Sequence, residues 1–380
     1  MFLGAQPNTL VCMTYRVIQW GTGNVGTFAL RAILDHPELD LAGVWVHDEA
    51  KVGQDAGVLC GRPPVGVTAT NDADSLLALG ADCVCYASTT DLRPVEGVQE
   101  ICRILASGSN VVSSSPVALV HPKSCVPEFR DQLTHAACRG GTSLFISGID
   151  PGFVNDVLPL TLTALCGQWE ELRVIEILNY STYDRPEALF DAMGFGKPID
   201  DTPMLLTPGV LEFTWGGALN MLAEGLGLSL DGIEAGFEKR PAARPLMIGT
   251  HTIEPGTLAA LRFEVRGIVA GRTPLVIEHV TRLDDGLAPD WPTGSGSYHV
   301  IVTGEPTIHC ELAFENRDGD HTVGAVVATA TRIVNAIPAV CCLAPGFHSA
   351  LDLPPITGGG RYAHAVNTRD VLTLPTPDAG

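Results

Sequence analysis

A glycine-rich turn near the start of the chain is the first place where residue type and spacing point to chemistry. Residues 21–26 read Gly-Thr-Gly-Asn-Val-Gly and follow an apolar run at 15–20. In such a turn the first glycine permits the bend, the second lets backbone N–H groups approach a pyrophosphate, and the third lets a helix pack closely on the strand. The N-terminus of that helix adds partial positive charge. The pattern predicts a dinucleotide site with contacts from Gly21, Thr22, Gly23, Asn24, Val25 and Gly26.

The end of the second expected strand carries residues that could distinguish NAD from NADP. A carboxylate there accepts hydrogen bonds from the ribose hydroxyls of NAD, whereas a cation accommodates the 2′-phosphate of NADP. Asp48 favours NAD, His47 and Lys51 favour NADP, and a solvent-exposed loop without cofactor contact is the third interpretation. The predicted cofactor is NADP or NAD, and the sequence leaves the choice open.

Small hydroxyl residues close two further strands of the expected sheet. Ser88 and Thr89 follow the apolar run 81–87, and Ser113 lies at the end of the run 110–115. Ligands of parallel sheets bind outside the carboxyl ends of the strands. We therefore expect these three residues to contact the cofactor.

Titratable residues on later segments could transfer protons if these segments line a cleft beside the cofactor. Strand alternation places Glu176 on one face with Leu178 and Tyr180. If this face lines the cleft, Glu176 is a candidate general acid or base; if it faces outward, Glu176 is a surface charge, and both alternatives stay open. Tyr183 could orient a substrate through its hydroxyl or pack as an ordinary aromatic residue. The predicted catalytic candidates are Glu176, Tyr180 and Tyr183.

Four other residues carry a structural interpretation beside a chemical one. Asp150 is expected to cap a helix that begins near Val154, and His121 is a further titratable candidate for the cleft. His299 and His309 lie on adjacent expected strands, but no third ligand stands at metal-site spacing. The sequence therefore predicts no metal site.

Composition limits the class of protein. The chain has 380 residues, of which 46% are hydrophobic and 17% charged, which is typical of a folded protein with two domains. Its formal net charge of −20 repels nucleic acid and anionic membrane surfaces, so neither is expected as a partner. The sequence has no run of ~18 uninterrupted apolar residues and predicts no membrane span. Its 11 cysteines follow no metal-site spacing and indicate reduced thiols and a cytoplasmic location.

Apolar runs alternate with helix-like segments through the first 150 residues. This order of strand and helix predicts the α/β class, with a doubly wound parallel Rossmann sheet. The expected strands are 15–20, 41–46, 65–67, 81–87, 110–115 and 143–148, and the expected helices are 27–36, 95–107 and 125–139.

From about residue 171 the expected strands follow one another directly. Their alternation of apolar and polar positions predicts an α+β domain with a largely antiparallel sheet. The strands are 171–180, 246–253, 257–269, 273–283, 298–303 and 307–314, with a helical insertion at 186–195 and 209–226 between the first two. A last helix, 323–337, is expected to end at Pro338 and to pack back on the nucleotide domain.

These patterns divide the chain into four parts. They are a disordered extension (1–14), a dinucleotide-binding domain (15–150), a substrate and dimerisation domain (151–320), and a C-terminal helix and tail (321–380). The insertion carries hydrophobic residues that suit a pocket wall, a dimer interface or a core, namely Phe190, Met193, Phe195, Met204, Trp215 and Met221.

Six segments taken together carry a family resemblance. They are 16–26, 51–57, 148–153, 178–183, 193–196 and 334–338. The Asp-Pro-Gly-Phe turn at 150–153 and the Asn-Ala-Ile-Pro helix end at 335–338 are the more specific ones. On these residues the chain resembles the dihydrodipicolinate reductase-like superfamily, and within it the branch of 2,4-diaminopentanoate dehydrogenase and the native amine dehydrogenases.

The resemblance implies an NAD(P)-dependent enzyme with its cleft between the two domains. Such an enzyme interconverts a small apolar ketone or aldehyde plus ammonia with the primary amine, by hydride transfer to an iminium carbon. The resemblance also implies a homodimer. It further implies a contact from Asn335 to the nicotinamide carboxamide, for which a helix C-cap is the alternative.

Two departures from the family leave alternative functions open. The amine dehydrogenases place a catalytic glutamate just after the fifth strand, where this chain has Ser113-Ser114-Ser115-Pro116-Val117. Another group must then handle the proton, or the chain is a reductase of another C=O or C=N substrate without ammonia, or an inactive nucleotide-binding sensor. The chain also lacks the His-His-x-x-Lys run of dihydrodipicolinate reductases, which argues against that activity.

Overall fold

A seven-stranded sheet organises the first part of the chain in the computed structural model, which describes residues 14–91, 93–183, 185–294, 296–359 and 361. The strand order is β15-β6-β5-β4-β1-β2-β3, and every pairing is parallel. Of the predicted extension 1–14, only Thr14 is described. The strands are β1 (Tyr15–Trp20), β2 (Leu39–Trp45), β3 (Ala69–Thr70), β4 (Cys83–Tyr86), β5 (Asn110–Ser113), β6 (Ser143–Ile146) and β15 (Gly346–His348).

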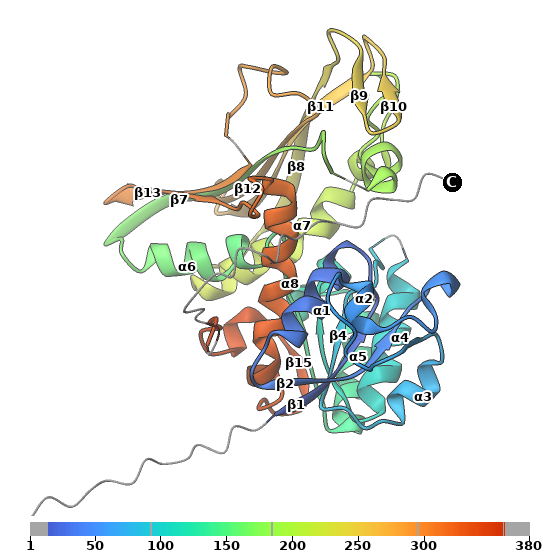
Figure 1. Ribbon diagram of the computed structural model, residues 1–380. Coiled ribbons are helices and arrows are strands. Elements are labelled where there is room, and N and C mark those ends of the chain that lie inside the picture. Colours follow the sequence, from blue (N-terminus) through green and yellow to red (C-terminus); the bar gives the residue numbers. More distant parts are fainter. Residues whose placement is uncertain (1–13, 92, 184, 295, 360, 362–380) are drawn as a thin grey trace, which may run out of the picture.

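Helices bury both faces of this parallel sheet, so the predicted doubly wound fold is confirmed. One face is covered by α1 (Asn24–Leu34) and the C-terminal half of α8 (His321–Val340), and the other by α4 (Pro94–Ala106) and α5 (Pro127–Gly140) (Figure 1). Each helix turns an apolar stripe toward the strands, and removal of such surface from water is the main force that holds the layers together.

The third strand differs from the prediction. Residues 65–67 form a loop, and β3 is the two-residue strand Ala69–Thr70. The carboxylate of Asp55 accepts hydrogen bonds from the backbone N–H groups of Val65 (2.9 Å) and Gly66 (2.8 Å), which therefore cannot join a strand ladder. The expected strand begins only after this loop.

A six-stranded sheet forms the second layer, in the order β14-β13-β7-β12-β11-β8. All neighbours are antiparallel except β12 and β7, so the prediction of a largely antiparallel sheet is confirmed. β8 was not predicted, because no residue of this edge strand is fully buried and its sequence shows little apolar alternation. The strands are β7 (Gln168–Asn179), β8 (Gly232–Pro241), β11 (Leu258–Val269), β12 (Arg272–Arg282), β13 (Ser297–Glu305) and β14 (Ile308–Ala313).

The prediction of a single strand at 246–253 is wrong. These residues form a hairpin of β9 (Leu246–Ile248) and β10 (His251–Ile253) outside the six-stranded sheet. Gly249 has a φ of +56° in this turn, a conformation that glycine adopts without steric cost.

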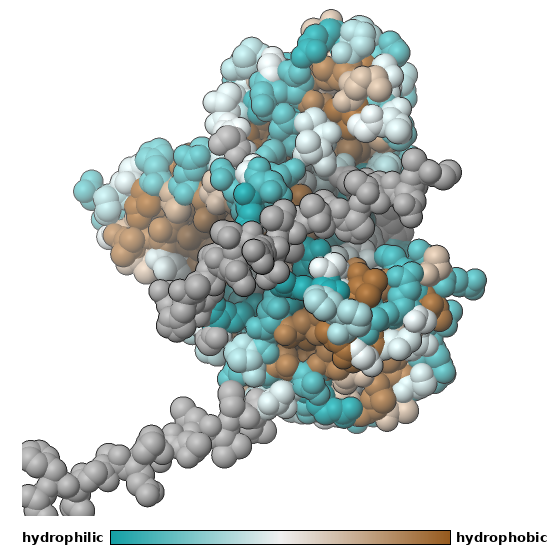
Figure 2. Space-filling view, viewed as in Figure 1, coloured by the Kyte–Doolittle hydropathy of each residue, from teal (hydrophilic) through white to brown (hydrophobic). Residues whose placement is uncertain are grey.

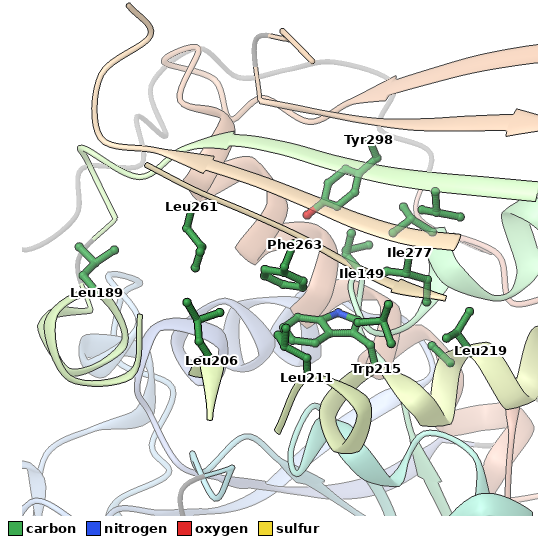
Figure 3. Packing of buried hydrophobic residues seen from close by; sticks show 14 of the residues in the cluster. Ile149, Leu189, Leu206, Leu211, Trp215, Leu219, Leu261, Phe263, Ile277 and Tyr298 are labelled. Carbon is green, nitrogen blue, oxygen red and sulfur yellow. The ribbon is translucent and has the colours of Figure 1, made fainter. Parts of the chain in front are cut away.

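The helical insertion packs one face of the six-stranded sheet, which we call the inner face. Its main helix is α7 (Val210–Gly225). Figure 3 shows Trp215 of α7 reaching toward Phe263 of β11, and Phe195 and Trp215 belong to the same buried cluster. Phe190 and Met193 pack against this cluster, Met221 is buried against the parallel sheet, and Met204 is 44% exposed. Five of the six insertion residues therefore serve the two cores.

Helix α8 connects the two layers (Figure 1). It does not end at Pro338 as predicted but continues to Val340, because a proline near the end gives up only one hydrogen bond of the last turn. By length and composition α8 could cross a membrane, but Ala330, Ile333 and Ile337 are fully buried against the parallel sheet. Such burial is typical of a core helix.

Candidate active site between the two sheets

A cavity of about 250 Å³ lies between the carboxyl ends of the parallel sheet and the inner face of the six-stranded sheet. One wall comes from residues 23–25 and from the loops after β4 and β5. The opposite wall comes from β7 and β13, and the N-terminal half of α8 closes a third side. The glycine turn and the face of β7 that carries Glu176 and Tyr180 thus line the same cavity.

The geometry of the glycine turn suits a pyrophosphate. Gly21 has a φ of +91°, and a Cβ on Gly26 would lie 2.2 Å from the carbonyl oxygen of Gly21, so both positions require glycine. A Cβ on Gly23 would meet no protein atom within 4 Å, and Gly23, Asn24 and Val25 line the cavity. No side chain caps the N-terminus of α1 at Gly23. The turn therefore leaves room for an anion at a positive helix end.

The adenosine-side candidates lie beyond this cavity. Asp48 is occupied in the local fold, since its Oδ1 accepts a hydrogen bond from the backbone N–H of Ala50 at 2.9 Å. The Lys51 ammonium donates to the Thr22 carbonyl oxygen (3.0 Å) and lies 3.4 Å from the Thr22 hydroxyl. His47 is exposed, with its ring 6.1 Å from that of Trp45. The cation, not the carboxylate, is in contact with the glycine turn.

The strand-end residues divide into two groups. Ser88 and Thr89 line the cavity, and Arg185 donates a hydrogen bond to the Thr89 hydroxyl at 3.1 Å across the two layers. Ser113 does not face the cavity: it is fully buried, and its hydroxyl bonds to the backbone of Ser115. Ser114 and Ser115 line the cavity instead, so the placement of Ser113 does not support its predicted contact with the cofactor.

Asn335 also lies away from the cavity. The last α8 residue on the cavity wall is Thr329, more than a turn before Asn335. Asn335 is not a C-cap either, since Cys341 takes that position. Its buried Oδ1 has no hydrogen-bond partner among the described residues. The predicted contact with the nicotinamide does not follow from this geometry.

Glu176 faces the cavity from β7 and belongs to a buried cluster of ionisable side chains. Its Oε1 lies 3.0 Å from Nδ1 of His279 on β12, which is the register partner of Glu176 in the parallel β7–β12 pair. Nε2 of the same imidazole lies 3.4 Å from Oδ2 of Asp150. Of the three side chains, Glu176 and Asp150 line the cavity, and all three are less than 10% exposed. Of the two alternatives that the sequence left open for Glu176, the structure has the one in which its side chain faces the cavity.

Asp150 does not cap a helix, contrary to the prediction. Its Oδ1 accepts a hydrogen bond from Trp215 Nε1 (2.9 Å) and its Oδ2 from Asn155 Nδ2 (3.0 Å). The cap of α6 (Val157–Thr163) is Asp156 instead. Burial raises the pKa of Asp150, but the neighbouring His279 and these two donors outweigh burial and lower the pKa below its ordinary value.

His279 was missed at the sequence level, although the pattern held a signal for it. In β12 it alternates with the buried residues Leu275 and Ile277, so its side chain must point to the inner face. Burial alone would lower the pKa of His279. The carboxylates of Asp150 and Glu176 reverse this effect and raise the pKa to about 10.

Three tyrosines complete the cavity wall around Glu176. Tyr180, Tyr183 and Tyr298 all line the cavity, and the rings of Tyr180 and Tyr183 are 4.6 Å apart. Burial, with the charges of Glu176 and Asp150, raises the pKa of Tyr180 and Tyr298 well above its ordinary value. Burial also raises the pKa of Tyr183, although Arg185 opposes it. Each tyrosine is therefore a neutral hydroxyl at physiological pH.

The remaining histidine candidates lie elsewhere. His121 hydrogen-bonds Ser124 (2.8 Å) and Glu224 (3.2 Å) and does not line the cavity, so its predicted place in the cleft is wrong. His309 faces Ile301 in the β13–β14 pair, not His299.

Among the described residues one group of three could offer ligand atoms to a metal, and it is the cluster of Asp150, Glu176 and His279. Nδ1 of His279 faces Glu176, whereas Nε2 faces Asp150. An ion bound at either nitrogen would have to displace the contact of that nitrogen with its carboxylate. The geometry suits hydrogen-bonded ion pairs better than a single metal ion.

The raised pKa of His279 predicts a loss of stability at alkaline pH. The folded value of about 10 lies above the ordinary ~6.5, so the folded chain holds a proton that the unfolded chain has released. This stabilisation is complete below about pH 6.5 and is lost as the pH rises toward 10, by up to about 1.4 kcal/mol per pH unit. Urea unfolding at several pH values between 7 and 9 measures the slope. An identical slope in the variant His279→Gln would contradict this source of the effect.

Comparison with known proteins supports a shared family for the whole chain. Residues 153–364 match the model of the 2,4-diaminopentanoate dehydrogenase C-terminal domain. The chain is 41% identical over 345 residues to an amine dehydrogenase of Streptomyces virginiae, which covers 89% of this chain and 95% of that protein. It is 23% identical over 294 residues to a 2,4-diaminopentanoate dehydrogenase of Acetoanaerobium sticklandii, with coverage of 74% and 76%.

A solved structure shares the fold. The amine dehydrogenase from Mycobacterium smegmatis has a TM-score of 0.73 with this chain at 21% identity, covering 90% of this chain and 97% of that one. Together with the fit of the glycine turn to a pyrophosphate, these matches establish the class of the protein. The chain belongs to the family of the amine dehydrogenases and 2,4-diaminopentanoate dehydrogenase, and it is an NAD(P)-dependent oxidoreductase that acts on CH–NH2 donors.

Proposed function

We propose that this protein interconverts a small, mostly apolar ketone or aldehyde plus ammonia with the primary amine, and that Glu176 handles the protons. The observation that carries the proposal is the buried Glu176 carboxylate on the same cavity as the phosphate-binding turn. The position of the family glutamate after β5 is occupied by Ser114 and Ser115, which carry no carboxylate. A carboxylate thus reaches the cavity from β7 instead of from β5.

The cavity residues divide the chemistry in a simple way. A bound nicotinamide supplies or accepts the hydride. Ammonia addition to the carbonyl and loss of water require proton transfers, and the Glu176 carboxylate is placed to accept and return these protons. An ionised Glu176 would also hold the positive iminium nitrogen by charge. The neutral hydroxyls of Tyr180 and Tyr183 can donate hydrogen bonds to the substrate carbonyl oxygen or orient the nitrogen.

Turnover with a panel of ketones and aldehydes tests this function. NADPH or NADH oxidation should require ammonium, and the product should be the primary amine. Oxidation that is independent of ammonium would favour a reductase of another C=O or C=N substrate. Cofactor binding without turnover across the panel would favour a sensor that has lost the chemistry.

We further propose that the preferred cofactor is NADPH. Asp48, the residue that favours NAD, is engaged with the backbone of Ala50, whereas the Lys51 ammonium contacts Thr22 in the turn. A 2′-phosphate on the adenosine ribose would find this ammonium within reach of the same turn. His47, exposed at the end of β2, can approach the phosphate from the solvent side.

Replacement of Lys51 by alanine should weaken NADPH binding by about tenfold or more and NADH binding much less, since a charge-assisted hydrogen bond contributes ~1.5–3 kcal/mol. Fluorescence titration of both cofactors measures the two dissociation constants. Lys123→Ala is the matched control, because that exposed lysine pairs with Glu224, outside the cavity. Equal losses for both cofactors would contradict the assignment of Lys51 to the 2′-phosphate.

Assembly and location complete the proposal. The family resemblance supports a homodimer, and Figure 2 shows hydrophobic residues gathered where β7, β13 and α6 lie in Figure 1. Leu165, just after α6, is 66% exposed. Light scattering on the purified protein tests the dimer. The net charge of −20 supports the expectation that the protein binds neither nucleic acid nor membranes, and its free cysteines support a cytoplasmic location.

A further inference from the structure

His279 stands behind Glu176 on the inner face and makes contacts that a merely space-filling histidine would not need. We propose that His279 is a permanently protonated positioning residue that keeps Glu176 ionised and aimed at the cavity, with Asp150 as the fixed counter-ion. This inference rests on the proposed role of Glu176 and deepens it. It makes His279, which does not itself line the cavity, the residue that controls whether Glu176 carries a proton.

Both ring nitrogens face carboxylate oxygens, Nδ1 in a hydrogen bond and Nε2 in a longer ion-pair contact, and this arrangement suits the imidazolium form. Nδ1 lies 3.0 Å from Glu176 Oε1, and Nε2 lies 3.4 Å from Asp150 Oδ2. A neutral imidazole has only one N–H and could serve only one of two ionised carboxylates, whereas the imidazolium serves both. Asp150 is further held in its ionised form, since Trp215 and Asn155 each donate a hydrogen bond to one of its oxygens.

Aromatic packing fixes the orientation of the imidazolium ring. The ring of Phe263 stacks on that of His279 at 4.7 Å with an interplanar angle of 10°, and Trp215 meets it edge-on at 4.6 Å. Aromatic rings attract a cation placed over their faces, so Phe263 favours the protonated form. Trp215 contacts both His279 and Asp150, which links the ring to its counter-ion.

The cluster of Asp150, Glu176 and His279 carries one uncompensated negative charge, and the other charged residues on the cavity wall, Asp91 and Arg185, are of opposite sign to each other. The groups that face His279 and Glu176 are two carboxylates, one imidazolium and the neutral hydroxyls of Tyr180 and Tyr298. The protonated His279 neutralises one of the carboxylates and leaves Glu176 as the anion at the cavity wall. A buried anion of this kind favours a cationic iminium over a neutral carbonyl.

The variant His279→Gln tests the proposal through its pH profile. Glutamine keeps hydrogen-bonding capacity but removes the positive charge, so two close carboxylates must share a proton. The shared proton leaves less free carboxylate to act at the cavity, so kcat for reductive amination near pH 7 should fall by about tenfold or more. The ratio of variant to wild-type kcat should rise with pH as that proton is lost.

A matched control and a direct measurement separate this proposal from a loss of folding. His309→Gln, at an exposed position on β14, should leave the rate and its pH profile unchanged. Cofactor titration and the melting temperature report whether His279→Gln is folded. The ¹⁵N NMR signals of His279 are assigned as those that are present in the wild type and absent from His279→Gln. In the wild type they should show both ring nitrogens protonated from about pH 6 to pH 8.

Two results would overturn the proposal. One is an imidazole of His279 that is neutral at pH 7, and the other is a ratio of variant to wild-type kcat that does not change with pH. If the proposed function itself fails, the wild type shows no ammonium-dependent turnover, while the NMR measurement still decides the protonation state of His279.

Discussion

Replacement of Glu176 by glutamine is expected to lower kcat for reductive amination by about 10²–10⁴, the range that a positioned general acid or base contributes. Glutamine has the same shape and can still accept the hydrogen bond from His279 Nδ1, but it cannot take up a proton. The cavity and the cofactor turn should remain intact, because Glu176 contacts neither the glycine turn nor Lys51. Steady-state rates with ammonium and a ketone that the wild type accepts measure the effect.

The control for this prediction is a glutamate on the same sheet with no place in the cavity. Glu305→Gln, at the exposed end of β13, should leave kcat unchanged. Cofactor affinity should be the same in the wild type and in Glu176→Gln, which separates a chemical defect from a binding defect. Full activity of Glu176→Gln would show that another group handles the protons.

The second large effect is expected at the glycine turn. Gly23→Val should weaken binding of NADPH and NADH by about 10²-fold or more, since each charge-assisted hydrogen bond that is lost contributes ~1.5–3 kcal/mol. A side chain at Gly23 meets no protein atom within 4 Å and the φ of −76° is open to any residue, so the chain should still fold. The added side chain instead fills the space through which a pyrophosphate approaches the backbone. Fluorescence titration of the cofactor gives the dissociation constant.

Gly26→Ala provides the contrast, because its Cβ would lie 2.2 Å from the carbonyl oxygen of Gly21. This substitution should destabilise the turn itself and lower the melting temperature, whereas Gly23→Val should melt close to the wild type. Retained cofactor affinity in Gly23→Val would mean that the pyrophosphate binds elsewhere.

Local patterns were sufficient to predict the elements around the glycine turn. The order of apolar strand, glycine turn and amphipathic helix depends on neighbours in the sequence, and the observed β1, turn and α1 follow it closely. Alternation along one strand also grouped Glu176 with Leu178 and Tyr180 on one face, but it could not tell whether that face lines the cavity. Local patterns are least exact at strand ends, where a shift of one residue changes the direction of a side chain. Ser113 is fully buried, whereas Ser114 and Ser115 line the cavity.

The cluster behind Glu176 could not be predicted in the same way. His279 meets Glu176 only because β12 lies beside β7 in parallel register, and Asp150 reaches the ring from the loop after β6. Strand pairing between distant segments is a property of the whole fold, and no local pattern specifies it. The prediction that Asp150 caps a helix followed a valid local rule. In the fold, however, its carboxylate accepts hydrogen bonds from the side chains of Trp215 and Asn155.

The course of α8 offers a way to alter which substrates are accepted. Asp320 caps its first turn, and a Cβ on Gly324 would press on the backbone of Glu315, so the start of the helix is firmly seated. Ala325 and Val326 look into the cavity, whereas the later turns are buried in the nucleotide layer. Bulkier or smaller side chains at these two positions should change which chain lengths and branching patterns of a ketone the cavity accepts. The charged side chains and the bound nicotinamide would keep their positions. Ala325 and Val326 are therefore the first positions to vary when the range of accepted ketones is to be changed.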